Sequence, residues 1–103
     1  MKGMNDLLRQ AQIMQSKMAK IQEEAGERQV EAASGGGMVK VIANGKQQIL
    51  SIVMEKEAVN PEDVEMLQDL TLTAVNEALR LAREMMEQEM GALTGGLKIP
   101  GFM

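Results

Sequence analysis

The chain has 103 residues and a formal net charge of −4, and 25% of its residues are charged. It contains no Cys and no His, which excludes disulfides, thiolate nucleophiles, zinc–thiolate sites and histidine-based catalysis. An enzyme would have to work with Asp, Glu, Lys or Ser alone, so we expect a protein that is not an enzyme and uses no cofactor and no metal. Its eleven Met and single aromatic residue predict a soft core that gains stability by self-association.

No targeting or membrane-spanning segment is predicted. The first residues turn polar before a signal-peptide core can form, and no apolar stretch is long enough to span a bilayer. We therefore expect a soluble protein of the cytoplasm without a membrane partner.

Residues 4–25 are predicted to form a helix. Apolar residues recur there at alternating spacings of three and four, the heptad pattern of a coiled-coil seam, at Met4, Leu7, Ala11, Met14, Met18, Ile21 and Ala25. The stripe is narrow, so the helix should pack against one neighbouring helix and end near Gly26. Residues 28–34 predict at most a short edge strand, and the three glycines at 35–37 predict a flexible turn.

A β-hairpin is the strongest strand signal in the chain. Residues 38–43 and 46–54 are rich in Val and Ile and are separated by Asn44-Gly45, the preferred pair for a two-residue type I′ turn. That turn would place Val41 opposite Gln48. The face expected to form the core carries Val39, Val41, Ala43, Leu50, Ile52 and Met54. The other face is too apolar for plain solvent exposure, so we expect a homodimer interface at Met38, Ile42, Ile49 and Val53.

Residues 60–90 predict a second, longer helix, with Asn60 as its N-cap and Pro61 as its first residue. Its broad apolar stripe indicates contact with both the sheet and another helix. At about 45 Å it should project beyond so small a globule. The Gly and Pro residues that follow predict a flexible tail, so the chain divides into a single α+β domain over residues 1–90 and a tail over residues 91–103.

Basic residues of the first helix are the main candidates for a binding site. Residues 1–22 carry four basic residues against one acidic residue. Lys2, Arg9 and Lys20 lie near one another on the side opposite the apolar seam, with Lys17 adjacent. Lys and Arg can contact phosphates without aromatic help, whereas base stacking requires aromatic residues, so duplex is favoured over single-stranded nucleic acid. Charge alone leaves a merely solvated helix face as the alternative.

Two other clusters are interpreted as structural. The glycines at 35–37 lack the residues that complete a phosphate-binding loop. The acidic residues between 55 and 65 lack the spacing of a calcium-binding loop and are expected to complement the dipole at the start of the second helix.

Short motifs occur in order along almost the whole chain. They are Met4-Asn5-Asp6-Leu7-Leu8-Arg9-Gln10-Ala11-Gln12, Gly36-Gly37-Met38-Val39-Lys40-Val41, Asn44-Gly45-Lys46, Asn60-Pro61-Glu62-Asp63-Val64-Glu65-Met66-Leu67, Gly91, Leu93-Thr94-Gly95-Gly96 and Ile99-Pro100-Gly101-Phe102. Each motif alone is weak, but the ordered set is specific. Through it the sequence resembles the YbaB/EbfC family of bacterial nucleoid-associated proteins.

The resemblance implies an α-β-β-β-α protomer with an antiparallel sheet, which dimerises in a tweezer-like shape. It implies a non-enzymatic protein of the cytoplasm and nucleoid that binds double-stranded DNA through its helices and affects nucleoid organisation or gene expression. Charge and helix position then select Lys2, Arg9, Lys17, Lys20, Arg80 and Arg83, with Lys98 in the tail as a weaker candidate.

The alternative is a protein-interaction or scaffold module. It would recruit a protein partner through the apolar seam and the Met-rich second helix. The total of only 11 basic residues favours this alternative over DNA binding.

Overall fold

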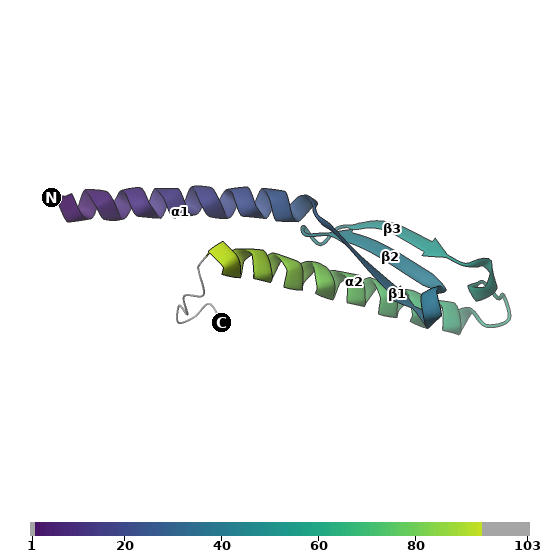
Figure 1. Cartoon of the computed structure of the whole chain (residues 1–103). Helices are drawn as coiled ribbons and strands as arrows, with labels where there is room; N and C mark the ends of the chain where they lie inside the picture. The colour runs from purple at the N-terminus through teal and green to yellow at the C-terminus, as the bar shows by residue number, and fades with distance from the viewer. Residues whose placement is uncertain (1, 94–103) are drawn as a thin grey trace.

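The computed structural model describes residues 2–93 of the chain (Figure 1). Its elements in chain order are α1 (Lys2–Glu27), β1 (Gln29–Ser34), the short 3-10 helix η1 (Gly35–Gly37), β2 (Val39–Asn44), β3 (Ile49–Met54), the short 3-10 helix η2 (Lys56–Ala58) and α2 (Val64–Leu93). The three strands form one antiparallel sheet in the order β1-β2-β3. The predicted α-β-β-β-α order is confirmed, and residues 94–103 of the predicted tail lie outside the described residues.

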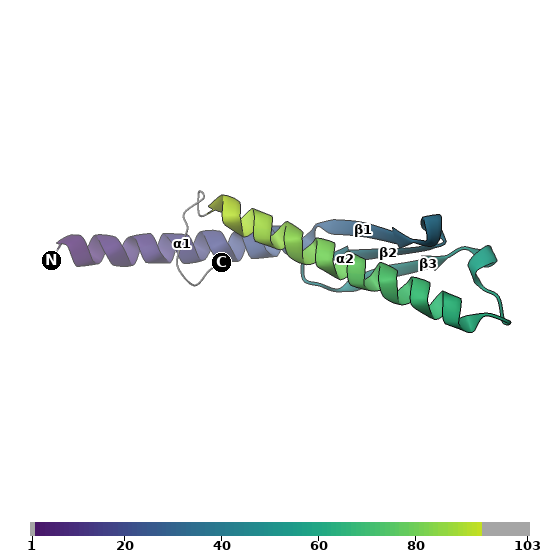
Figure 2. The same ribbon diagram turned by 90° about the horizontal axis from the view of Figure 1, so that it is seen from below.

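The two helices give the molecule an elongated shape of 74 × 23 × 16 Å. α2 crosses one face of the sheet and continues past it to lie antiparallel to α1 (Figures 1 and 2). The N-terminal part of α1 extends beyond the end of α2 in both views. The long second helix therefore projects beyond the sheet, as its length predicts.

The core lies between α2 and the first two strands. The buried side chains come from β1, β2 and α2, namely Ala32, Val39, Val41, Ala43, Ala74, Ala78 and Ala82. Alanines on the buried side of α2 allow the helix to approach the sheet closely. At the end of β1, the Ser34 hydroxyl donates a hydrogen bond of 2.6 Å to the backbone carbonyl of Leu70, which fixes α2 over this edge of the sheet.

The turn between β2 and β3 is longer than predicted. β2 ends at Asn44 and β3 begins at Ile49, so four residues, 45–48, connect the strands. The Asn44 N–H donates to the Gln48 carbonyl at 3.0 Å and the Gln47 N–H donates to the Asn44 carbonyl at 2.9 Å. Val41 therefore pairs with Ile52 and not with Gln48. The Asn44 side chain holds this longer turn, because its Oδ1 accepts from the N–H groups of Lys46 and Gln48, both at 3.0 Å. The predicted two-residue turn and its register are wrong for this reason.

β3 is left largely uncovered within one chain. Leu50, Ile52 and Met54, which were expected in the core, are 48%, 44% and 39% exposed. α2 packs against β1 and β2, and a helix about 10 Å wide covers two strands spaced about 4.8 Å apart. The expectation that these three residues join the core is therefore wrong for the single chain.

α2 also begins later and ends later than predicted. The Asp63 N–H donates to the Asn60 carbonyl at 2.9 Å, so residues 60–63 form a turn before the helix. The N-cap is Asp63, whose Oδ1 accepts from the Met66 N–H at 3.2 Å, and not Asn60. At the other end the helix continues through Gly91 to Leu93, three residues beyond its predicted end at residue 90.

Candidate nucleic-acid interface

Among the described residues, no other element covers the N-terminal part of α1. Every residue from Gly3 to Lys17 is exposed, and Met18 is the first that is half-buried. Beyond this point Ile21 is half-buried and Ala25 is buried, where α1 contacts α2 and the sheet. We call residues 3–17 the arm. It offers solvent a helical surface on all sides.

Arg9 and Lys20 lie on the side of α1 that is turned away from α2, and Lys17 lies at the edge of that side. The periodicity of 3.6 residues per turn places Arg9 and Lys20 within about 20° of each other around the helix, with Lys17 about 60° to one side. All three are exposed, and none forms an ion pair within residues 2–93. Lys2 lies on the same side by this periodicity, at the first residue of α1, but its side chain is outside the described part. These four residues are called the basic stripe.

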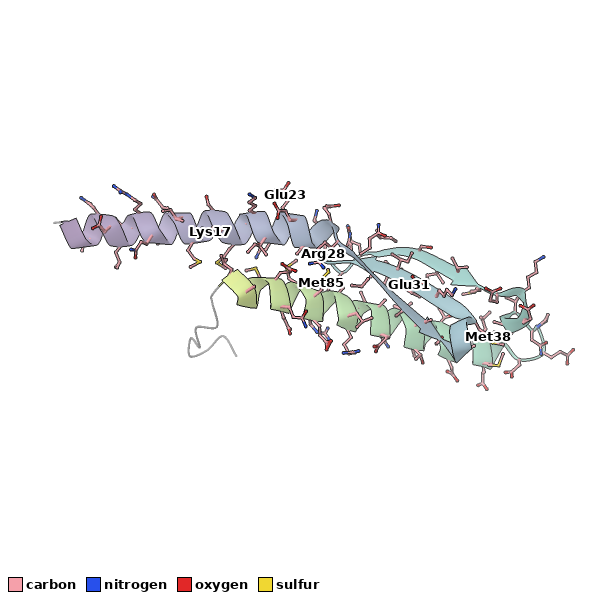
Figure 3. The ribbon with its side chains drawn as sticks, in the orientation of Figure 1. Lys17, Glu23, Arg28, Glu31, Met38 and Met85 are labelled. Atoms are coloured by element: carbon pink, nitrogen blue, oxygen red, sulfur yellow. The ribbon has the colours of Figure 1, made fainter. Side chains whose placement is uncertain are left out.

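Acidic residues limit the extent of this positive surface. Asp6 lies close to the stripe near the arm tip, and Glu23 lies on the side of α1 that faces away from α2 (Figure 3). Glu27 forms an ion pair of 2.8 Å with Lys46, and this hydrogen bond raises the pKa of Lys46. The unpaired positive charge of α1 is therefore concentrated between residues 9 and 20.

The two candidate basic residues of α2 differ from each other in their ion pairs. The Arg80 guanidinium is paired with Glu77 and, at 2.6 Å, with Glu84, and its hydrogen bond with Glu77 lowers the pKa of that carboxyl. The same two carboxylates raise the pKa of Arg80, Glu77 more strongly, so its charge is already balanced within α2. Arg83 is exposed and forms no ion pair with another described residue.

The structure does not bring the two sets of basic residues together on one face of the protomer. Helical periodicity places Arg80 and Arg83 on the side of α2 opposite Ala78, which packs on the sheet. The basic stripe of α1 points the other way, since the apolar side of α1 is the one that meets α2. Lys98, the remaining candidate, lies outside the described residues.

The predicted dimer residues divide between the two faces of the sheet. Val53 pairs with Lys40, so it lies on the outer face, and so does Ile42, which pairs with Ser51. A bulge between Ile42 and Ala43 places Ile49 opposite the buried Ala43, on the side of α2. Val53 and Ile49 are 53% and 36% exposed, and Met38 and Ile42 are half-buried.

Lys40 is a further exposed basic residue that the charge pattern of the sequence did not single out. Lys40 lies on the outer face of the sheet, because its neighbours Val39 and Val41 are buried beneath α2. The alternation Val39-Lys40-Val41 could have placed it there.

The described residues contain no other candidate site. Within residues 2–93 no three acidic side chains gather closely enough to hold a metal ion. None of the helices in this part of the chain combines the length and hydropathy that crossing a membrane requires.

Comparisons with known proteins agree on one family. The sequence model of the YbaB/EbfC DNA-binding family matches residues 1–97. A nucleoid-associated protein of Pelotomaculum thermopropionicum is 58% identical over 100 residues, covering 97% of this chain and 95% of that protein. A nucleoid-associated protein of Desulforamulus reducens is 62% identical over 100 residues, with the same coverage of 97% and 95%.

A solved structure has the same fold. The crystal structure of an uncharacterized protein from Helicobacter pylori superimposes with a TM-score of 0.75 at 22% sequence identity. The match covers 86% of this chain and 94% of that chain.

Proposed function

The chain belongs to the YbaB/EbfC DNA-binding family, and from this premise we propose that it binds double-stranded DNA as a homodimer through the basic stripe of α1. The family and the names of its relatives indicate a DNA-binding protein of the nucleoid. The proposal adds which surface touches DNA and how many copies act together.

The observation that carries the proposal is the set of unpaired basic side chains on the arm and just after it. Arg9 and Lys20 are separated by about 16 Å along the helix axis, since each residue adds about 1.5 Å. The major groove of B-DNA is about 12 Å wide, and Arg and Lys side chains are long. The two residues can therefore reach phosphates on both sides of that groove, with Lys17 between them.

A second copy of the chain is proposed to cover β3. This strand is at the edge of the sheet and carries exposed apolar residues on both faces, at Ile49, Leu50, Ile52, Val53 and Met54. Edge strands of this kind present unpaired backbone groups to another chain. The predicted interface residues Met38 and Ile42 lie next to this strand and would extend the contact.

A homodimer would present two basic stripes, one on each protomer. Three described basic residues in each protomer give about six phosphate contacts, so binding should be salt-sensitive and largely independent of sequence. Arg83 faces the opposite side of the protomer and would need a further DNA segment, whereas Arg80 would first have to leave Glu77 and Glu84. Broad effects on nucleoid organisation or gene expression are consistent with binding of this kind.

Charge reversal on the arm tests the proposal. Fluorescence anisotropy of a labelled duplex should show that Arg9→Glu and Lys20→Glu each weaken binding and that the double variant abolishes it, with the dimer mass unchanged. Lys56→Glu is the matched control, because Lys56 is exposed, without an ion pair among the described residues, and in η2 on the far side of the sheet from the arm. Equal losses for the control and the arm variants would mean that net charge alone matters and would contradict the proposed surface.

Recruitment of a protein partner is a second candidate function. It is favoured by the exposed apolar residues of the arm, among which Met4 and Leu7 are 62% and 69% exposed. Stable complexes that survive high salt, together with no affinity for duplex DNA at low salt, would favour this function over DNA binding.

A further inference from the structure

The apolar seam of the arm is uncovered among the described residues. Met4, Leu7 and Met14 are 62%, 69% and 40% exposed, and Leu8 beside them is 59% exposed. α2 packs on the later part of α1, where Met18 is the first half-buried residue. A helical segment of about 15 residues with nothing packed on it is marginally stable in water. A second helix packed along this heptad seam would therefore stabilise the arm.

The spacing of the seam residues makes the arm complementary to itself. We propose that the arm of a second copy of the chain covers the seam, and that the two arms form an antiparallel coiled coil. Met4 of each copy then lies against Met14 of the other, and Leu7 of each lies against Ala11 of the other. The large Leu7 is thus paired with the small Ala11, which fills the layer without a void. A parallel pair would place Ala11 against Ala11 and leave that layer underfilled.

The end of α2 selects this register. A shift of one heptad, with Met4 against Ile21, would bring the tip of the second arm onto Met18 and Ile21, which are half-buried where α2 packs on α1. α1 extends past the end of α2 in both views, which leaves the arm open to a second helix (Figures 1 and 2). With Met4 against Met14, Met18 of each copy lies beyond the arm tip of the other. The two sheets are then at opposite ends of the pair and do not collide.

The charges beside the seam favour a second copy as its occupant. The flanking positions of the arm carry four uncharged residues and one cation, namely Gly3, Leu8, Gln10, Gln15 and Lys17. In the antiparallel pair Leu8 of one copy lies near Leu8 of the other, and Lys17 lies near Gly3, so like charges do not face each other. Arg9 lies on the opposite side of α1 and stays exposed, so the proposal does not rest on DNA binding.

Engineered cysteines test the register directly, because the chain has no Cys of its own. Isotope-labelled full-length Leu7→Cys is mixed with unlabelled Ala11→Cys in a glutathione redox buffer, and intact mass identifies each disulfide-linked pair. Two cysteines are bridged only when their Cα atoms are within about 7 Å. In the proposed register Leu7 of one copy lies level with Ala11 of the other, whereas the two Leu7 residues are about 6 Å apart along the axis.

Ser16→Cys is the matched control for the cysteine pairs, because Ser16 is exposed on the side of α1 opposite the seam. Leu7→Cys should form a disulfide with Ala11→Cys about ten-fold faster than with Ser16→Cys. Equal rates with the two partners would overturn the proposal and leave the seam to a different protein partner. A faster disulfide between two Leu7→Cys chains would indicate a parallel pair and would also overturn it.

Self-association without cysteines gives an independent test. Four core layers form a small interface, so we expect weak association, as in interfaces that bury less than about 1,200 Å². Sedimentation equilibrium of full-length Leu7→Gln/Met14→Gln should show an association step about ten-fold weaker than in wild type. Ile13→Gln is the control, because Ile13 is apolar and 47% exposed but lies away from the seam. Equal association of the double variant and Ile13→Gln would overturn the proposal.

Discussion

Gly45→Ala is expected to destabilise the protein where α1 meets the sheet. Gly45 is buried in the β2–β3 turn, and its N–H donates a hydrogen bond of 3.1 Å to the Arg28 carbonyl. A Cβ at this position would overlap the Ala25 carbonyl oxygen and would lie 2.8 Å from the Ala25 carbonyl carbon and 3.0 Å from the Gly26 Cα. These are backbone atoms at the end of a helix, so they cannot rotate away. α1 and the turn must move apart.

The expected loss follows from the size of this overlap. Forcing an extra carbon into a packed site costs about 1–3 kcal/mol, and contact with rigid backbone places Gly45→Ala near the upper end, at about 2–3 kcal/mol. For a domain of this size each kcal/mol lowers Tm by roughly 4–8 °C. Urea denaturation followed by far-UV circular dichroism measures the change in unfolding free energy, at one fixed protein concentration because the stability of the proposed dimer would depend on concentration.

Gly3→Ala is the matched control. A Cβ at Gly3 meets nothing within 4 Å, and the residue lies in the first turn of α1, so this variant should change the unfolding free energy by less than about 0.5 kcal/mol. If Gly45→Ala changed the unfolding free energy by less than about 0.5 kcal/mol, the close seating of α1 on the β2–β3 turn would be refuted.

Two further substitutions test contacts of α2. Ser34→Ala removes the hydrogen bond of 2.6 Å to the Leu70 carbonyl and should lower the unfolding free energy by about 1 kcal/mol in the same urea assay; an unchanged midpoint would contradict a stabilising role. Glu77→Gln should make the helical far-UV circular dichroism signal depend less on pH in acid. The pKa of Glu77 is lowered by its hydrogen bond to Arg80, so its contribution to stability is present above the unfolded-state pKa and is lost as pH falls through the lower, folded-state pKa. Both side chains are exposed, so the difference between wild type and variant should be small and should shrink at high salt. Identical acid titrations of the two proteins at low salt would contradict a stabilising ion pair.

The helices and strands could be predicted because periodicity specifies them. The heptad spacing in residues 4–25 and the Val- and Ile-rich segments around Asn44 each correspond to an element of the structure. The register between β2 and β3 could not be predicted, because Asn44-Gly45 permits turns of more than one length and the buried Asn44 side chain selects the longer one. The resulting shift from Gln48 to Ile52 opposite Val41 is four residues, an even number, so Val39 and Val41 still face the core as predicted.

The sequence allows the basic residues to be placed around α1, whereas their role as a binding site stays a prediction. Helical periodicity places Arg9 and Lys20 opposite the apolar seam with Lys17 adjacent to them, and the spacing of Glu77 and Glu84 around Arg80 could have indicated its ion pairs. The open side of the arm could not be predicted. The heptad pattern continues along all of α1, and only the end of α2 in space decides how much of it is covered.

The salt dependence of DNA affinity tests most directly whether the basic stripe contacts phosphate. Anisotropy of a labelled duplex gives the association constant at several salt concentrations. With three contacts from each of two protomers, the slope of its logarithm against that of salt concentration should be about −5. The Arg9→Gln/Lys17→Gln/Lys20→Gln variant should lose most of this slope and most of its affinity, whereas Lys56→Gln should keep both. A triple variant that binds with the wild-type slope would contradict the account.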